Sequence, residues 1–551
     1  MKPLLLGIDI GTTGAKAVLI DSPGDVLAEH TTEYPMATLR PGWAEQDPAD
    51  WWQAAVRSVR QVLSSSKFKP QDIAGIGLTG QMHGLVLLDE KDKVLRPCIM
   101  WNDQRTAKQC EDINRRVGLD RIITITGKPA LTGFTAGKIL WVRENEPDVY
   151  ARARHIQLPK DYVRLRLTGE YAIDVADASG TNLLDTGRRA WSEEVVGLLD
   201  IPLDWLPKVH ECHEVVGRIT AQAAEETGLL SGTPVVVGAG DQATQSVGTG
   251  IVDEGVVSVT IGTSGVVFAA TNDYRPDKTG RMHAYCHAAP GRWHLMGVTL
   301  SAGGSLRWLR DTLWRRTELH PEITQIAAPS PSPSPLKGEG MEGRGCSTTE
   351  HESVKSAKST DGQSGPDLYD LMTAEASRIP AGSEGLLFLP YLSGERCPHP
   401  DPNARGVFFG LSLRHSLPHL TRAVIEGVTF SLRDCLELLC EHNLACGRIR
   451  VSGGGSRSAF WRQVMADVFN AEVVTVNITQ GAAFGAALLA GVGTDTYASA
   501  QEACARTIRE TGSTKPGPDR KAYDDYYQRY RALYPKLKDE FALLADAAGR
   551  H

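Results

Sequence analysis

Asp241 stands on a glycine turn in the segment VVVGAGDQATQSVGTG, which begins at Val235. The segment is typical of a short buried strand, a tight turn and a helix of small residues. Residues 238–243 also fit the G-x-G-x-x-A pattern of a dinucleotide-binding turn. That pattern requires an acidic residue about 20 positions further on to hold the ribose, but the segment SVTIGTSG in that region has Thr260 and no acid. We therefore favour Asp241 itself as a general base that deprotonates an alcohol during phosphoryl transfer.

Two short turns could bind the phosphates that such a reaction needs. They are Gly11-Thr12-Thr13-Gly14 and Gly262-Thr263-Ser264-Gly265, each between two apolar runs. Backbone N–H groups and hydroxyls without bulky side chains form anion-binding concavities. One such turn alone is usually only a tight hairpin, whereas a pair could hold a polyphosphate from both sides of a cleft. Neither turn is a Walker A loop, because no G-x-x-x-x-G-K-[ST] occurs in the chain.

Asp9 lies on the predicted strand just before the first turn. A carboxylate beside bound phosphates repels them unless a cation lies between. We therefore expect Asp9 to act on Mg²⁺ through water, since Mg²⁺ keeps several of its waters in protein sites. The alternative is an aspartate that only caps the turn.

Three further elements carry groups suited to ligands. The triplet Gly453-Gly454-Gly455 follows a predicted strand and could admit an adenosine, or could be only a tight strand-to-helix turn. The loop Gly80-Gln81-Met82-His83-Gly84 offers donors and acceptors for a sugar or polyol, although a lone histidine is more often structural. The cluster Trp101-Asn102-Asp103-Gln104-Arg105 could line the same pocket or cap a helix.

The elements that must position these groups alternate along the chain. Residues 4–21 predict a β-hairpin, and Asp47-Pro48 predicts the start of a helix with apolar residues at helical spacing. Residues 73–78 and 85–88 predict strands, so the fold class is α/β. The C-terminal stripe of Tyr523, Tyr527, Tyr530, Tyr534 and Leu537 predicts the docking face of a closing helix.

An internal repeat indicates two related halves. GIDIGTTGAKAVLI from Gly7 parallels SVTIGTSGVVFAA from Ser258, at an offset of 251 residues that places Asp9 opposite Thr260. The simplest interpretation is two α/β domains with a cleft between them, and chance similarity of two glycine-rich hairpins is the alternative. A chain of 551 residues is also too long for one core.

Composition excludes several classes of protein. The net charge of -7 and the absence of an evident basic face argue against nucleic acid as a partner. The ten cysteines form no C-x-x-C, which favours a reducing compartment. No signal peptide or bilayer-length apolar run is evident, so we expect a soluble cytoplasmic protein with no membrane partner. Residues 327–366 are rich in Pro, Ser, Gly and charge, which predicts a disordered surface insertion, with a regulatory or partner-binding segment as the alternative.

Taken in order, these motifs resemble the FGGY carbohydrate kinases along nearly the whole chain. Besides those above, Leu158-Pro159-Lys160-Asp161 and YLSGERCPHPDPNARGVFFG from Tyr391 belong to the likeness. The resemblance implies two domains of the ribonuclease H-like, actin/Hsp70/hexokinase-like fold, which we place at residues 1–242 and 243–540. This chain departs from the family pattern at the 327–366 segment, which is an additional segment, and at Cys397, where family members commonly have threonine.

The resemblance also implies an activity. The loops at 80–84 and 101–105 resemble those of members that use ATP and Mg²⁺ to convert D-xylulose to D-xylulose 5-phosphate. Relatives acting on ribulose, gluconate or glycerol are the alternatives, and an actin- or Hsp70-like protein-binding ATPase is a more distant one. Many members are homodimers.

Carried over by position, the resemblance assigns roles to individual residues. Asp241 matches the catalytic base, and Asp9 matches the aspartate that acts through Mg²⁺. The expected sugar contacts are Gln81, Met82, His83, Trp101, Asn102, Asp241 and Gln242. The expected nucleotide and phosphate contacts are Gly11, Thr12, Thr13, Gly262, Thr263, Ser264, Gly303, Gly454 and Gly455.

Overall fold

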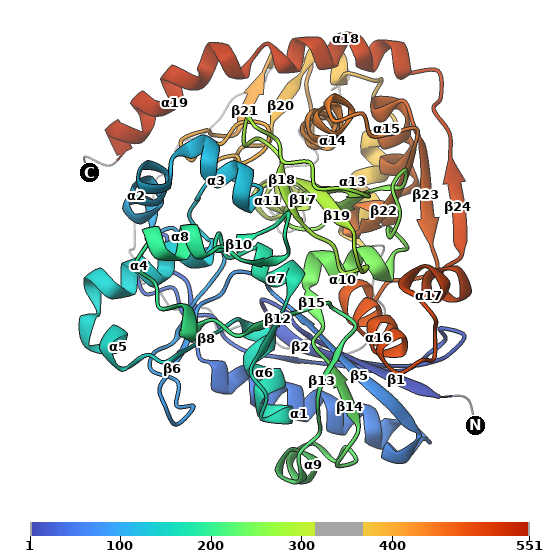
Figure 1. The fold of residues 1–551 in the computed structure, drawn as a ribbon. Coiled ribbons are helices and arrows are strands. Elements are labelled where there is room, and N and C mark those ends of the chain that lie inside the picture. Colours follow the sequence, from blue (N-terminus) through green and yellow to red (C-terminus); the bar gives the residue numbers. More distant parts are fainter. Residues whose placement is uncertain (1–2, 315–366, 549–551) are drawn as a thin grey trace, which may run out of the picture.

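A computed structural model describes residues 3–314 and 367–548 of the chain. The predicted insertion at 327–366 lies outside the described residues. The chain forms two α/β halves, with the N-terminal strands in the lower half of the view and the later strands in the upper half (Figure 1). The predicted fold class is confirmed.

The first sheet contains the predicted N-terminal hairpin and the strand that precedes the 80–84 loop. Its order is β13 (Val215–Arg218), β14 (Pro234–Val236), β5 (Ile73–Gly80), β1 (Leu4–Ile10), β2 (Gly14–Asp21) and β3 (Val26–Glu33), with β15 (Ala239–Gly240) also paired to β5. Strand β1 is antiparallel to β2 and parallel to β5. The strand predicted after the 80–84 loop is β6 (Val86–Leu88), and it pairs with β8 (His155–Gln157) outside this sheet.

The second sheet repeats this arrangement. Its order is β18 (His283–Cys286), β19 (Trp293–Thr299), β17 (Gly265–Thr271), β16 (Val257–Ile261), β22 (Arg448–Gly453), β23 (Glu472–Val476) and β24 (Glu510–Thr514). Strand β16 is antiparallel to β17 and parallel to β22, as β1 is to β2 and β5. The predicted repeat therefore corresponds to the same hairpin at the same place in both sheets.

Helices cover the sheets where apolar stripes require it. Helix α1 (Pro48–Ser65) begins at the predicted N-cap, where the Asp47 carboxylate accepts from the Ala49 N–H at 2.9 Å, and it packs on β2 and β3. In the second half, α14 (Leu417–Glu441) and α15 (Ala459–Phe469) pack on each other, and α14 contacts β17 and β19. The helix after the glycine triplet is capped by Ser458 and preceded by a short 3-10 turn at Gly454–Arg457.

One helix crosses from the second half to the sheet of the first. Helix α16 (Gly481–Gly493) comes from the C-terminal part of the sequence but packs on β1 and β5 of the first sheet. Helix α10 (Asp241–Gly248) lies beside α16 (Figure 1) and donates from Gln245 Nε2 to Thr260 Oγ1 of the second sheet at 2.8 Å. The predicted boundary between residues 242 and 243 thus follows the order of the sequence, whereas the packing interleaves the two segments.

The contact between α16 and the first sheet depends on glycine. A Cβ on Gly7 would lie 1.9 Å from the Ala483 carbonyl oxygen, and one on Gly77 would lie 1.9 Å from that of Ala486. No side chain fits at these distances, so the helix backbone rests directly on the strands.

The C-terminal aromatic stripe is confirmed as a docking face, but it spans two helices. Tyr523, Tyr527 and Tyr530 are buried on α18 (Arg520–Arg531), and the tyrosine hydroxyls of Tyr523 and Tyr527 donate to Glu426 and Asp434 of α14. Tyr534 and Leu537 lie on α19 (Tyr534–Ala548), which begins after a break at residues 532–533. Within the described ranges, no helix is both long and apolar enough to cross a bilayer.

The glycine contact yields a stability prediction. Gly77→Ala should lower the free energy of unfolding by ~1–3 kcal/mol, because the new methyl group overpacks the backbone of α16. Urea unfolding followed by circular dichroism measures the change. Gly197→Ala is the matched control, since Gly197 lies on α8 (Glu193–Leu198) with no atom within 4 Å of the added Cβ. Equal effects of the two substitutions would contradict the close contact.

Candidate active site

Three neighbouring parallel strands end at the same edge of the first sheet. Asp9 pairs with Thr79 in the β1–β5 ladder, and Gly80 pairs with Gly240 in the β5–β15 ladder. The carboxyl ends of β1, β5 and β15 therefore bring together the first turn, the 81–83 loop and Asp241. Ligands of open α/β sheets bind at such an edge.

Asp9 is partly exposed, but its Oδ1 atom is buried and accepts no hydrogen bond from the described residues. The pKa of Asp9 is raised to about 7, first by burial and then by the negative charge of Asp241, against a lowering by Lys16. The two carboxylates are therefore close enough to repel each other. An oxygen without a partner beside a second carboxylate is suited to a cation, which fits the Mg²⁺ expected here.

Lys16 is a site residue that the motif analysis missed. It pairs with Asp9 across the β1–β2 hairpin, and its ammonium lies 2.9 Å from Glu29 Oε2. Counting outward from the turn, which places Asp9 opposite Lys16, would have identified it.

Among the described residues, no group of three or more His, Cys, Asp and Glu side chains could hold a metal ion.

Asp241 is the first residue of α10, and the turn before it requires glycine. Gly238 has a φ of 80°, and its Cβ would lie 1.9 Å from the Leu78 carbonyl oxygen. A Cβ on Gly240 would lie 2.6 Å from Met82 Cγ and 2.7 Å from Asp177 Oδ1. The turn is thus closely packed against β5 and the sugar-side loop, which fixes the start of α10.

Burial raises the pKa of the Asp241 carboxyl to about 6, against a lowering by Gln242. Gln242 Nε2 donates to Asp241 Oδ1 at 3.3 Å. The carboxyl is therefore largely ionised at neutral pH and more basic than a solvated aspartate, as a general base requires.

The first turn is held by polar side chains from three other segments. The Gly11 N–H donates to the Gly14 carbonyl at 3.1 Å. Gln46 Nε2 donates to the Thr12 carbonyl at 2.7 Å, and Trp101 Nε1 donates to Thr12 Oγ1 at 3.0 Å. Tyr34 donates its hydroxyl to the Gly11 carbonyl. Gln46 and Tyr34 carry no motif in the sequence, and only the tertiary structure places them here.

Two of the predicted sugar contacts are bonded to this turn: Trp101 directly, and Gln81 through Gln46. A third, Asn102, lines a different hollow. Gln81 Nε2 donates to Gln46 Oε1 at 2.9 Å, while its Oε1 is buried without a partner. Asn102 lines a separate surface hollow with residues 38–44, where its Nδ2 contacts Met36 Sδ at 3.8 Å. Asn102 Oδ1 is buried without a partner among the described residues, and its contact with the sugar stays a prediction.

His83 is held in one orientation and one charge state. Its backbone has a φ of 69°, and its carbonyl accepts from Lys138 Nζ at 2.7 Å and from Thr135 Oγ1 at 3.1 Å. Its Nδ1 lies 2.9 Å from the Gly180 carbonyl, which can only accept. Burial, then Lys138, lowers the pKa of the ring well below its usual range. The neutral ring therefore donates from Nδ1 and keeps Nε2 as an acceptor for a hydroxyl.

The second half of the chain closes one side of this pocket. Met82 packs in one cluster with Val266, Phe268, Tyr285 and Met296, all from β17, β18 and β19. The His83 ring lies 4.8 Å from the Phe134 ring and 6.4 Å from that of Tyr285. The sugar-side residues are therefore enclosed by both halves.

A pocket of about 530 Å³ opens on the edge of the second sheet. Its lining includes the predicted residues Gly262, Thr263, Gly303, Gly454 and Gly455. The Gly303 N–H donates to the Gly262 carbonyl at 2.8 Å, and a Cβ on Gly303 would lie 2.5 Å from that oxygen. The walls also include residues that were not predicted, among them Arg307, Tyr369, Arg457 and Trp461. Ser264 stays in the turn but is not among the lining residues.

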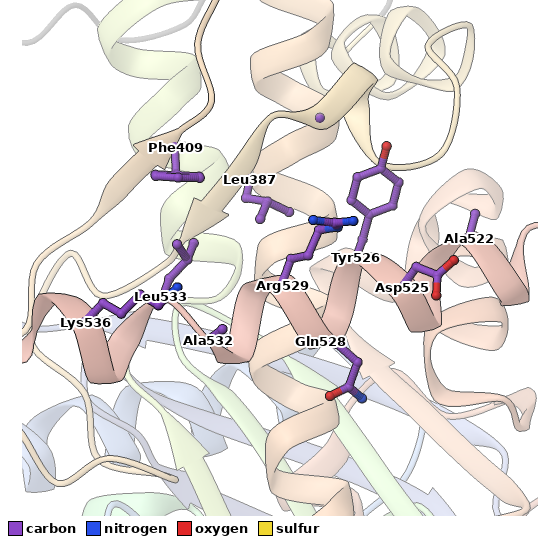
Figure 2. Close-up of a pocket in the computed structure, with 11 residues that line it drawn as sticks. Leu387, Phe409, Ala522, Asp525, Tyr526, Gln528, Arg529, Ala532, Leu533 and Lys536 are labelled. Atoms are coloured by element: carbon purple, nitrogen blue, oxygen red, sulfur yellow. The ribbon is translucent and has the colours of Figure 1, made fainter.

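A hollow of about 790 Å³ lies on the outer side of helix α18 and contains none of the predicted site residues. Figure 2 shows Tyr526 and Arg529 rising from α18 toward Leu387 and Phe409 of the hairpin formed by β20 (Leu387–Leu389) and β21 (Val407–Phe409). The residues predicted to be catalytic, Asp9 and Asp241, lie at the edge of the first sheet instead.

Family comparisons agree with this geometry. Residues 4–248 match the N-terminal domain of the FGGY family of carbohydrate kinases, and residues 257–494 match its C-terminal domain. The xylulose kinase of Bacillus subtilis (strain 168) is 35% identical, covering 97% of each chain. That of Escherichia coli (strain K12) is 35% identical over 97% of this chain and 99% of its own. The gluconokinase of Bacillus subtilis (strain 168) is 30% identical over 99% and 98% of the two chains.

Solved structures of similar proteins share the fold. A xylulose kinase from Brucella ovis is 36% identical with a TM-score of 0.81, covering 97% of this chain and 99% of its own. A ligand-bound xylulose kinase from Lactobacillus acidophilus is 26% identical with a TM-score of 0.84, covering 98% and 100%.

The raised pKa of Asp241 predicts a pH-dependent effect on stability. The unfolded chain releases this proton near pH 4, whereas the folded protein releases it near pH 6, so the ionised carboxylate disfavours folding at higher pH. In the ligand-free protein, Asp241→Asn should therefore raise the free energy of unfolding by ~1–3 kcal/mol at pH 8 and by much less at pH 4. Urea unfolding at both pH values measures this. Asp539→Asn on exposed α19 is the control, and a gain independent of pH would contradict the assignment.

Proposed function

Because the chain belongs to the FGGY family of carbohydrate kinases, we propose that it transfers the γ-phosphoryl group of ATP to the C5 hydroxyl of D-xylulose. The observation that carries the proposal is the convergence of Asp241, Asp9 and the His83 loop at one sheet edge, opposite a pocket on the other sheet. The choice of sugar is supported by the xylulose kinases, which are 35% identical over nearly the full length.

Asp241 accepts the proton of the attacking hydroxyl. Its carboxylate lies at the first turn of a helix, beside the 81–83 loop, with a pKa raised to about 6 by burial. The general base acts as the sugar oxygen attacks the γ-phosphorus in line. Gln242 holds Oδ1 from one side and leaves the other carboxylate oxygen for the hydroxyl.

The two turns and Lys16 hold the phosphates. In the turns at residues 11–13 and 262–264, the Gly11 and Gly262 N–H groups are bonded within the turn, so the residues that follow each glycine supply the N–H groups. Lys16 supplies a positive charge beside Asp9. Asp9 would hold Mg²⁺ through water, since its Oδ1 is buried without a partner. When bound, Mg²⁺ neutralises phosphate charge and lowers the repulsion between the phosphates and the two carboxylates.

The sugar is oriented by the loop after β5. His83 Nε2 accepts a sugar hydroxyl, because Nδ1 is committed to the Gly180 carbonyl. Gln81 Oε1 offers a second buried acceptor, and Met82 packs the apolar face of the pocket. We assign Trp101 to positioning the first turn through Thr12, and we keep Gln242 beside the base.

We also propose that the enzyme works in the cytoplasm, as a homodimer. All nine described cysteines are free thiols, which is typical of a reducing compartment. A homodimer follows only from the family resemblance.

One other acceptor has specific support. The gluconokinase of Bacillus subtilis is 30% identical over nearly the whole chain, so gluconate is the second candidate. Gluconate differs from D-xylulose in having a carboxylate, one more carbon and no keto group, and a phosphorylation assay distinguishes the two acceptors directly.

ATP consumption by the purified enzyme with Mg²⁺, tested against ketoses, polyols and sugar acids, should be fastest with D-xylulose. We expect kcat/KM for D-xylulose to exceed that for gluconate, ribulose and glycerol by at least ~10-fold, since one misplaced hydroxyl leaves buried polar groups unpaired. A preference for gluconate would replace the proposed acceptor. ATP hydrolysis stimulated by peptides and by no sugar would instead indicate a protein-binding ATPase.

Asp241→Asn should lose turnover by at least ~100-fold while still binding ATP and sugar, because the amide cannot accept the proton. Steady-state kinetics and calorimetric titration of each ligand measure the two properties. Asp539→Asn should behave as the wild type. Turnover within a few-fold of wild type would remove Asp241 from the role of base.

A further inference from the structure

The motif YLSGERCPHPDPNARGVFFG has no role in the mechanism above. It forms the connection from β20 to β21, and its central residues are tied to the end of β19. Glu395 Oε2 accepts from Thr299 Oγ1 at 2.7 Å, while Oε1 accepts from the N–H groups of Leu300 at 3.0 Å and Arg396 at 2.7 Å. Both carboxylate oxygens of Glu395 thus accept hydrogen bonds that fix the backbone around Arg396.

The Arg396 guanidinium has no protein partner. Across residues 3–314 and 367–548, it makes no ion pair and donates no hydrogen bond from its side chain, although its neighbour Glu395 is acidic. Burial lowers the pKa of Arg396, which reflects the cost of desolvating this cation. A guanidinium carries five N–H donors, and because Arg396 is only partly buried, these donors stay open to a ligand.

Arg396 reaches from the second half to the first. Its Nη2 lies 4.0 Å from the position that a Cβ on Gly133 would take, in the loop that precedes Phe134. Its charge acts on the rings of His83, His283 and Tyr285. The charge of Arg396 is felt by the His83 ring but is not among the groups that shift the pKa of Asp241, so Arg396 lies on the His83 side of the candidate sugar site.

The other titratable side chains near Arg396 do not pair with it. Lys128 and Lys138 are buried nearby, and each ammonium is matched by backbone carbonyls: Lys128 by Thr126 and Ala284, and Lys138 by His83 and Gly133. His83 and His283 are neutral, because burial lowers the pKa of both rings. Arg396 is therefore a cation at the wall of the pocket with donors directed to no protein acceptor.

We propose that Arg396 is a substrate-binding residue supplied by the second half, whose guanidinium donates to oxygen atoms at the end of the sugar remote from Asp241. The proposal rests on the proposed function in one respect, that the acceptor is a sugar. In D-xylulose the remote end carries the C1 hydroxyl and the C2 carbonyl, both of which accept hydrogen bonds. Since His83 and Arg396 come from different halves, the sugar completes its contacts only when both halves are in place.

The test compares Arg396→Met and Arg396→Lys with Arg405→Met, each in the full-length enzyme. Arg405 belongs to the same motif but is exposed, and it donates only to the Pro402 and Ala404 carbonyls of its own turn. For each variant, the KM of sugar and of ATP, kcat, and the affinity for sugar alone by calorimetry are measured. The sugar is D-xylulose if the wild type phosphorylates it, and otherwise the best acceptor of the panel, so that a wrong acceptor does not decide the outcome.

We expect Arg396→Met to raise the sugar KM and Kd by about 10- to 100-fold, the usual effect of a lost charged hydrogen bond, with the ATP KM unchanged within about 2-fold. Arg396→Lys should lie between Met and wild type, because it keeps the charge and loses the fork geometry. A sugar KM like that of Arg405→Met, or equal rises in both KM values with a lowered melting temperature, would overturn the proposal. If the Met variant does not fold, the Lys variant is judged by the same two comparisons, the sugar KM and the ATP KM relative to those of the wild type.

Discussion

The site depends on one constraint, the close packing of helices α16 and α10 between the two sheets. Helix α16 rests on the backbone of β1 and β5 at Gly7 and Gly77, and α10 packs along it through the equally close pair of Gly485 and the Thr244 carbonyl. Asp9 and the 81–83 loop follow from those strands, and Asp241 opens α10. The helix contact therefore sets the relative position of the base, the metal-facing carboxylate and the sugar-side loop. No side chain intervenes, so there is little room for adjustment.

The site is electrostatically unfavourable until ligands arrive. Two partly buried carboxylates, with pKa values raised to about 7 for Asp9 and about 6 for Asp241, repel each other at a sheet edge with Lys16 as the opposing charge. Arg396 is a partly buried cation that has no ion-pair or hydrogen-bond partner for its side chain among the described residues. Phosphates with Mg²⁺ and a polyhydroxyl sugar would supply the missing partners of both kinds. Functional sites commonly hold such uncompensated groups, and the rest of the fold supplies the stability that they cost.

The polar network also links the sugar side with the phosphate side. Gln81 and Trp101 reach the first turn through Gln46 and Thr12, while Glu395 connects the Arg396 loop to the end of β19, just before Gly303. The residues proposed to contact the sugar are thus bonded, within one or two steps, to residues proposed to contact the phosphates. This arrangement suits a transfer reaction in which both substrates must be held in line.

The sequence alone determined the fold class and the repeated hairpins, and it singled out the carboxylates that we propose as catalytic, because these depend on local patterns. Strand periodicity and glycine turns lie within a few residues, and the carboxylates of Asp9 and Asp241 stand directly beside them. Only the tertiary structure decided which distant residues share the site. Gln46, Tyr34 and Arg396 carry no local signal, Asn102 lies in a separate hollow, and α16 crosses to the sheet of the other half. Each of these depends on contacts between segments tens to hundreds of residues apart, which packing selects and which no local pattern encodes.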